Sequence, residues 1–186
     1  QAHAFGLPED GIFARFEEAL EVIVPLVRGG HADFEGMFHA ARDLPQAPRG
    51  PRPGGIPLLI GGNGPRGQRH AIRHADIWSG YVEERAHVDE IAPRIASLEA
   101  ICSEEGRDPA TIGRSIGVLV NPFLPAGARP NVVSGSAVEI AAALRSFLDA
   151  GYTQVELMFG PGTIEALEAL APVIELVKAD GGGSAG

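Results

Sequence analysis

Cysteine, positive charge and long apolar runs are scarce in this sequence. Cys102 is the single cysteine among 186 residues, so an internal disulfide is excluded and a reducing compartment such as the cytoplasm is expected. The 15 Lys and Arg residues face 24 Asp and Glu residues, and the formal net charge of −9 argues against nucleic acid or an anionic membrane as a partner. No window approaches the roughly 18 apolar residues that a membrane span requires.

What remains is the composition of one globular domain. With 45% hydrophobic residues over 186 positions, the chain can bury a sizeable core. The Gly- and Ser-rich tail at 181–186 is expected to be disordered, so we expect the domain to cover residues 1–180. Because the chain opens on Gln1 and shows no signal peptide, we also expect a trimmed or partial sequence.

Four short apolar stretches alternate with amphipathic helical segments. The expected strands are 57–60, 75–80, 116–120 and 155–159. Helix signals support this assignment, since Gly106 ends one helix and the capping box of Ser136 and Glu139 begins another. Alternation of this kind predicts an α/β fold in which helices cover a parallel sheet.

The first quarter of the chain has a different pattern. Apolar residues at three- and four-residue spacing over 12–27 predict an amphipathic helix that is bent or ended near Pro25. Its expected solvated side carries Glu17, Glu18 and Glu21. The connector at 44–55 is too rich in proline to lie inside a helix or strand.

The stretch 56–67 joins an apolar strand to a glycine-rich turn and a helix start. This layout gathers free backbone N–H groups and directs a helix dipole toward an anion. Pro65 suits the first helical position, and Arg66 is placed to add a charged fork to a phosphate. The glycines match neither the dinucleotide fingerprint nor the P-loop, so a tight turn that binds nothing stays an alternative. Gly160-Pro-Gly162 with Thr163 is a rival anion loop.

Other chemistry-bearing residues favour structural interpretations. His70 and His74 have the spacing of a metal pair, but no third ligand accompanies them, so we interpret them as a solvated helix face and predict no metal site. Trp78 is interpreted as a core or wall residue, and Cys102 as a packed thiol. Paired carboxylates for acid–base chemistry are not identifiable, so we predict no catalytic residue within this chain.

Seven short segments occur in one order along nearly the whole chain. They are Arg15-Phe-Glu-Glu-Ala-Leu-Glu-Val-Ile, Phe34-Glu-Gly36, Ile56-Pro-Leu-Leu-Ile-Gly-Gly-Asn-Gly-Pro-Arg66, Ala75-Asp-Ile-Trp78, Gly106-Arg-Asp-Pro109, Ser134-Gly-Ser-Ala-Val-Glu139 and Asp149-Ala-Gly151. Together they resemble the C-terminal half of bacterial luciferase-like monooxygenases. The resemblance implies a (β/α)8 TIM barrel, of which this chain would hold the last four βα units, about four parallel strands with covering helices.

The resemblance also implies a cofactor and its contacts. Family members bind either FMN or the deazaflavin coenzyme F-420, whose phosphate lies near the loop after the fifth barrel strand. That loop corresponds to Gly61, Gly62, Asn63, Gly64 and Arg66, and Ser79 would line the same mouth. The N–H groups of 62–64 would donate to phosphate oxygens. The Gly-Gly-Asn-Gly-Pro-Arg form looks more like the F-420 branch, so F-420 is the expected cofactor and FMN the alternative.

The resemblance therefore implies an oxidoreductase that acts on a small organic substrate. With F-420 the reaction would be hydride transfer to or from the substrate, and with reduced FMN it would be monooxygenation. In the family, many cofactor and substrate contacts lie on the first four strands, so this chain by itself need not be active. Because a half barrel has two open sheet edges, we expect a fragment of a longer chain, a homodimer or pairing with a complementary barrel half.

Two other interpretations stay open at this point. A non-catalytic half-barrel module would bind a phosphorylated ligand or a partner chain. A separate small α/β domain of flavodoxin type would place the four strands in an open sheet, although the family order of the motifs speaks against it. The sequence reveals neither the substrate, nor the direction of electron flow, nor the number of subunits.

Overall fold

The chain forms two compact units, residues 1–57 and residues 58–186, of which the second contains the parallel sheet. The computed structural model describes Ala4, Gly6 and residues 10–180. The tail at 181–186, expected to be disordered, lies outside the described residues. No helix in the described part of the chain is long and apolar enough to cross a membrane.

The first unit consists of α1 (Ile12–Gly29) and a hairpin of β1 (His31–Glu35) and β2 (Ala40–Pro45). The helix runs on through Pro25 and ends at Gly30, which adopts a left-handed conformation with φ 76°. It therefore does not end near Pro25. The hairpin was not predicted, because its short and mostly exposed strands show no alternation of apolar and polar residues.

Glu18 connects the helix of the first unit to the hairpin. Its carboxylate accepts the backbone N–H groups of Met37, Phe38 and His39 at 2.9, 2.7 and 2.9 Å. Glu18 was expected on the solvated side of the helix; it is partly exposed there, and it also satisfies three amides of the hairpin turn.

The second unit alternates strands and helices. Its elements are β3 (Leu59–Gly61), α2 (Pro65–His74), β4 (Ile77–Tyr81), α3 (Val88–Glu104), β5 (Gly113–Asn121), β6 (Val132–Ser134), α4 (Ala137–Asp149), β7 (Gln154–Phe159) and α5 (Ile164–Asp180). The four expected strands are present as β3, β4, β5 and β7, and all their pairings are parallel. This confirms the α/β class with a parallel sheet. The three-residue strand β6 was not predicted.

The long central strand β5 organises the sheet. It pairs with β4 over residues 113–117, with β6 over 119–121 and with β7 over 115–120. Because the β7 pairing overlaps both others, β7 must take the opposite edge of β5 from β4 and β6. Within the described residues, β3 pairs only with β4, and β6 and β7 pair only with β5, so each of these three strands has an open edge.

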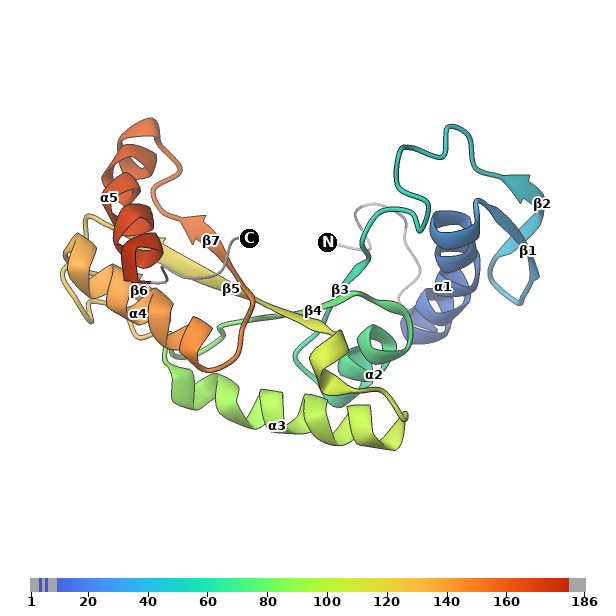
Figure 1. Cartoon of the computed structure of the whole chain (residues 1–186), viewed down its shortest axis with the longest axis horizontal. Coiled ribbons are helices and arrows are strands. Elements are labelled where there is room, and N and C mark those ends of the chain that lie inside the picture. Colours follow the sequence, from blue (N-terminus) through green and yellow to red (C-terminus); the bar gives the residue numbers. More distant parts are fainter. Residues whose placement is uncertain (1–3, 5, 7–9, 181–186) are drawn as a thin grey trace. The chain divides into compact units, whose positions relative to one another are not determined.

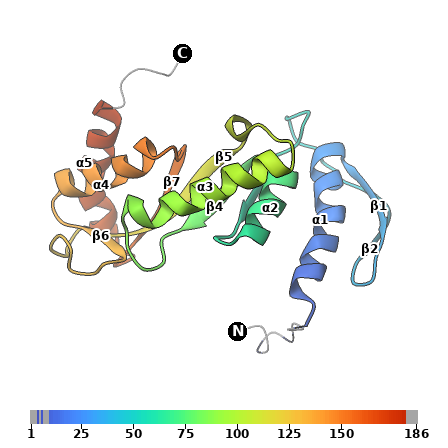
Figure 2. The same cartoon turned by 90° about the horizontal axis from the view of Figure 1, so that it is seen from below.

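The two faces of the sheet differ sharply in burial. On the covered face, Trp78, Ile116 and Val118 are fully buried beneath the helices. Figure 1 shows α2 and α3 together on one side of the sheet, and in Figure 2 α3 passes in front of β4 and β5. The opposite face is open, with Leu59, Tyr81 and Met158 exposed to 46%, 49% and 50%.

Hydrogen bonds fix α2 within this arrangement. The buried Gln68 side chain donates to the carbonyl of Arg94 at 2.8 Å and accepts from the Ser97 hydroxyl at 2.7 Å, which joins α2 to α3. Before β4, the Asp76 carboxylate accepts the N–H of Leu58 at 2.7 Å and so holds the start of β3 beside β4. The turn between β3 and α2 is therefore supported from both sides.

Candidate cofactor-binding site

The candidate site is the three-residue turn between β3, which ends at Gly61, and α2, which begins at Pro65. Both backbone polar groups of Gly62, its N–H and its carbonyl, are hydrogen-bonded to β4. Its N–H donates to the carbonyl of Ser79 at 3.0 Å, and its carbonyl accepts the indole N–H of Trp78 at 2.8 Å. The N–H of Gly62 therefore does not point to a phosphate, which corrects the donor role expected for it.

Asn63 anchors the same turn through its side chain. Its amide oxygen accepts the N–H of Tyr81 at 3.0 Å, and its amide nitrogen donates to the carbonyl of Tyr81 at 3.1 Å. This reciprocal pair replaces a stretch of sheet pairing at the end of β4. Among the described residues, the backbone N–H groups of Asn63 and Gly64 have no acceptor, so these two amides are the donors that the turn offers to a ligand.

Two glycines allow the helix to start directly against the strand. Gly62 has φ +151°, and a Cβ added to it would lie 3.1 Å from the Cα of Gly67. A Cβ on Gly67 would meet the Cα of Gly62 at the same distance. Gly64 differs, because it has φ −92° and nothing within 4 Å of an added Cβ. The strand and helix are thus packed backbone to backbone, while the space beside Gly64 is open to a ligand.

The remaining predicted site residues surround this turn. Gly61 and Gly64 are exposed, Ser79 is partly exposed on the open face of β4, and Arg66 is exposed in the first turn of α2. The structure therefore brings the predicted residues together at the carboxyl ends of β3 and β4, where parallel sheets place ligands. Pro65 occupies the first turn of α2, as expected.

Two polar groups of the rival loop after β7 have partners within the protein. The N–H of Gly160 donates to the carbonyl of Val120 at 2.9 Å, and the Thr163 hydroxyl accepts the N–H of Ala166 at 3.3 Å as α5 begins. The backbone N–H of Gly162 has no acceptor among the described residues, so this loop stays an alternative anion site.

A family comparison identifies the chain. The model of the family described as luciferase-like monooxygenase matches residues 1–124, which is about two thirds of the sequence. The chain belongs to the luciferase-like monooxygenase family. The expected relationship is therefore confirmed, and the matched residues include the turn after β3 and all of β4.

Known relatives of the family agree with this assignment. An F420-dependent glucose-6-phosphate dehydrogenase of Nocardia farcinica (strain IFM 10152) is 28% identical over 116 residues, which are 59% of this chain and 32% of the relative. The structure of an F420-dependent secondary alcohol dehydrogenase in complex with an F420-acetone adduct superposes with a TM-score of 0.75 at 15% identity, over 95% of this chain and 66% of that one. A riboflavin lyase with modified FMN and riboflavin gives a TM-score of 0.68 at 14% identity, over 100% and 62%.

The chain thus spans about a third of the curated relative and about two thirds of each solved structure. At these identities the solved structures establish a shared fold. The family consists of flavin- and F420-dependent oxidoreductases and monooxygenases, and members of both cofactor classes are among the matches.

In this family member, the loop that follows β4 is also fixed. The Glu90 carboxylate accepts the N–H groups of Glu83 at 2.9 Å and of Glu84 at 3.2 Å, and that of Arg85, while Arg94 lies 3.1 Å away. Partial burial opposes ionisation of Glu90, but these N–H donors and the charge of Arg94 lower its pKa overall. Sequence reasoning missed this anchor, because an i,i+4 Glu–Arg pair resembles an ordinary exposed helix pair.

A carboxylate on the open face of the sheet was also missed. The buried Ser115 hydroxyl donates to Glu156 at 2.6 Å, and the strand register places Glu156 opposite Gly117, which is itself opposite Tyr81. An acidic residue between Val155 and Leu157 in a strand is the signal that identifies it, because alternation turns it away from the apolar helix layer.

The histidine and cysteine candidates have structural positions. His70 is buried, so its interpretation as part of a solvated helix face is wrong. Gln68, Ala71 and Ile72 of α2 are buried as well. Cys102 is buried, and burial raises the pKa of its thiol, consistent with a packed thiol. No group of three potential metal-binding side chains occurs within residues 10–180 and the two described residues before them.

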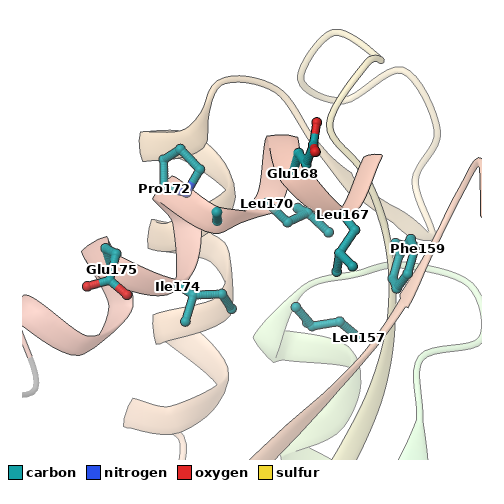
Figure 3. Close-up of a pocket in the computed structure, with 9 residues that line it drawn as sticks. Leu157, Phe159, Leu167, Glu168, Leu170, Pro172, Ile174 and Glu175 are labelled. Atoms are coloured by element: carbon teal, nitrogen blue, oxygen red, sulfur yellow. The ribbon is translucent and has the colours of Figure 1, made fainter. Parts of the chain in front are cut away.

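A large hollow of the second unit is lined by residues outside the site. It has a volume of about 750 Å³ and lies between β7 and α5. Figure 3 shows Leu157 and Phe159 of β7 and Leu167 and Ile174 of α5 around it. Because its lining is almost entirely apolar, this groove has no groups suited to a cofactor phosphate.

Proposed function

We propose that this chain is part of a luciferase-like oxidoreductase that holds the phosphate of its cofactor at the turn between β3 and α2. The observation that carries the proposal is the pair of unoccupied amides of Asn63 and Gly64 at the start of a helix. The helix dipole favours an anion there, and Arg66 adds a nearby cation. Gly61 and Ser79 would border the bound cofactor.

Coenzyme F-420 is the cofactor that we propose, with FMN as the alternative. The form of the glycine-rich turn and the F420-dependent enzymes among the relatives support this choice. The cofactor would supply hydride transfer to or from a small organic substrate, or monooxygenation in the case of FMN. Anaerobic reduction of the bound cofactor followed by exposure to air would separate the two, because a reduced deazaflavin reacts only slowly with oxygen.

The phosphate position can be tested at Gly64 with a matched pair of variants. Ser and Asp are both good N-cap residues and both fit the open space, so neither should disturb α2. Only Gly64→Asp adds a negative charge. We expect fluorescence titration with F-420 and FMN to show at least about tenfold weaker binding for Gly64→Asp, equal to about 1.4 kcal/mol, and little change for Gly64→Ser. Equal affinity of both variants, or no binding by the wild-type protein, would contradict the proposal.

A second candidate function is that of a binding module that completes its barrel with another polypeptide. It is favoured by the open edges of β3 and β7 and by the apolar groove beside β7. A strand added parallel to β7 would place apolar side chains into that groove. The partner would be a complementary barrel half or a second copy of this chain.

Sedimentation equilibrium tests this module. If two copies pair through the groove, Ile174→Lys should give a monomer, while Val138→Lys should leave the dimer intact. Val138 is 67% exposed on α4 and does not line the groove. A wild-type monomer at all concentrations would contradict pairing between copies.

A further inference from the structure

A second hollow, of about 300 Å³, lies between the loop after β4 and the segment after β5. Its walls include Arg85 and His87 from the first loop and Gly127 and Arg129 from the second. Both segments follow the carboxyl ends of parallel strands, the side of the sheet on which ligands bind.

The charge at this hollow is unusual for a chain of net charge −9. Most described arginines donate to a carboxylate or to a backbone carbonyl. The side chains of Arg85 and Arg129 have no such partner among the described residues. Within the described part of the chain, the one other arginine without such a partner is Arg52 in the first unit. Two of three unpaired guanidinium groups therefore line one small hollow, although acidic residues are abundant. Unpaired cations placed together repel each other, and an anion between them removes that repulsion.

The walls are held together without a ligand. The N–H of Ala86 donates to the carbonyl of Pro130 at 2.7 Å, which joins the two segments. Glu90 fixes the first loop through the N–H groups of Glu83 and Glu84. Arg94 pairs with both Glu90 and Glu83, so one acidic charge lies near the first loop, although neither carboxylate lines the hollow.

His87 adds a further feature. It is the N-cap of α3, so the positive end of that helix dipole lies beside the hollow. Its Nδ1 atom accepts the backbone N–H of Asp89 at 3.2 Å, and the Asp89 carboxylate lies 3.2 Å from the same atom. The side chains of Arg85 and Arg129 have no such partner in the described part of the chain.

We propose that this hollow is a second anion site, which binds an oxyanion group of phosphate type through Arg85 and Arg129. This inference goes beyond the proposed function, because the cofactor phosphate would occupy the turn at Asn63 and Gly64. The second site would hold an anionic group from another source, either free phosphate or a phosphorylated small molecule. The hydrogen bond between Ala86 and Pro130 joins the two segments that form it.

Inorganic phosphate is the direct probe. The backbone N–H signal of Gly127 in a 15N spectrum should shift in a saturable way as phosphate is added at constant ionic strength. Arg85→Gln and Arg129→Gln should each weaken this response by about tenfold, since each removes a charge-assisted donor. Arg52→Gln is the matched control, because it removes the same charge from an unpaired arginine in the other unit. All three arginines are exposed, so folding should be unaffected.

Absence of a saturable response at Gly127, or equal weakening by Arg52→Gln, would overturn the proposal. The source of the anion is resolved by adding FMN or F-420 instead of phosphate. A cofactor response at Gly64 alone supports two separate sites. A cofactor response at Gly127 that is lost in Arg129→Gln would overturn the assignment to a second ligand. Failure of Gly64 to respond would count against the proposed function and leave the phosphate result at Gly127 intact.

Discussion

The two faces of the sheet in the second unit contrast with each other. The covered face carries Trp78, Ile116 and Val118, which are fully buried under helices. The open face carries Leu59, Tyr81 and Met158, each about half exposed. Trp78 and Tyr81 lie on the same strand, β4, and alternation turns them to opposite faces, so their difference in burial comes from what lies against each face.

The covered face therefore contributes most of the buried packing of the sheet, whereas the open face has the room that a ligand needs. The covered face is connected to the site by one hydrogen bond, which the indole N–H of Trp78 donates to the carbonyl of Gly62. The open face offers partly exposed groups such as Ser79 and Glu156, which have room for a ligand or a further strand. Substitutions that are matched across the two faces should therefore behave differently.

The largest expected difference is between Trp78→Ala and Met158→Ala. Removing the buried indole leaves a cavity and frees the carbonyl of Gly62, so we expect a loss of about 3–5 kcal/mol in the free energy of unfolding. Met158 is half exposed, and its truncation should cost less than about 1 kcal/mol. Urea denaturation followed by circular dichroism measures both. Similar losses would show that the open face is as well packed as the covered one.

The next difference lies within the turn. Gly62→Ser meets positive φ and the backbone of Gly67, so we expect it to destabilise the protein by about 1–3 kcal/mol. Gly64→Ser has open space and introduces an N-cap hydroxyl, so its effect should be neutral or slightly stabilising. Thermal unfolding of both variants tests this, and an equal loss in both would refute the close packing of β3 on α2.

A smaller effect is expected in the helix layer at low pH. Hydrogen bonds from Arg73 and Arg69 lower the pKa of Glu105 from its ordinary value near 4.5 to about 2. Its stabilising contribution is therefore complete above about pH 4.5 and is lost as the pH falls toward 2. Melting temperatures measured from pH 6 to pH 2.5 should fall less steeply for Glu105→Gln than for the wild type. Identical slopes would exclude this linkage.

The smallest expected effect concerns Tyr152, whose ring lies 6.1 Å from that of Trp78. Its buried hydroxyl has no hydrogen-bond partner among the described residues, and burial raises its pKa to about 12. Because Tyr152→Phe removes an unsatisfied polar group from the covered side, it should stabilise the protein by up to about 1 kcal/mol. A clear loss of stability in urea denaturation would show that the hydroxyl has a partner.

The sequence predicted the parts of the fold that depend on local pattern. The four parallel strands were expected from apolar runs, and the site was expected where one run meets a glycine-rich turn. The hairpin of the first unit was missed because its strands are short and mostly exposed. The strand β6 was missed because its three residues, although buried, are too few to show a pattern of their own.

The details of the site depended on contacts distant in sequence. Nothing in the turn itself indicated that Ser79 would accept the N–H of Gly62, or that the Asn63 side chain would bind the backbone of Tyr81. His70 was misassigned for the same reason, since its burial results from the packing of α2. Periodicity identified the elements, whereas tertiary contacts determined which polar groups are left for a ligand.

The phosphate contact at the turn is tested most directly by comparing a cofactor with the same chromophore lacking its phosphate. FMN against riboflavin, and F-420 against its phosphate-free deazaflavin, should differ in affinity by at least about tenfold for the wild-type protein. In Gly64→Asp that difference should disappear, because the added carboxylate repels the phosphate alone. Equal affinity of the phosphorylated and phosphate-free forms for the wild type would contradict the assignment of the turn between β3 and α2 as the phosphate site.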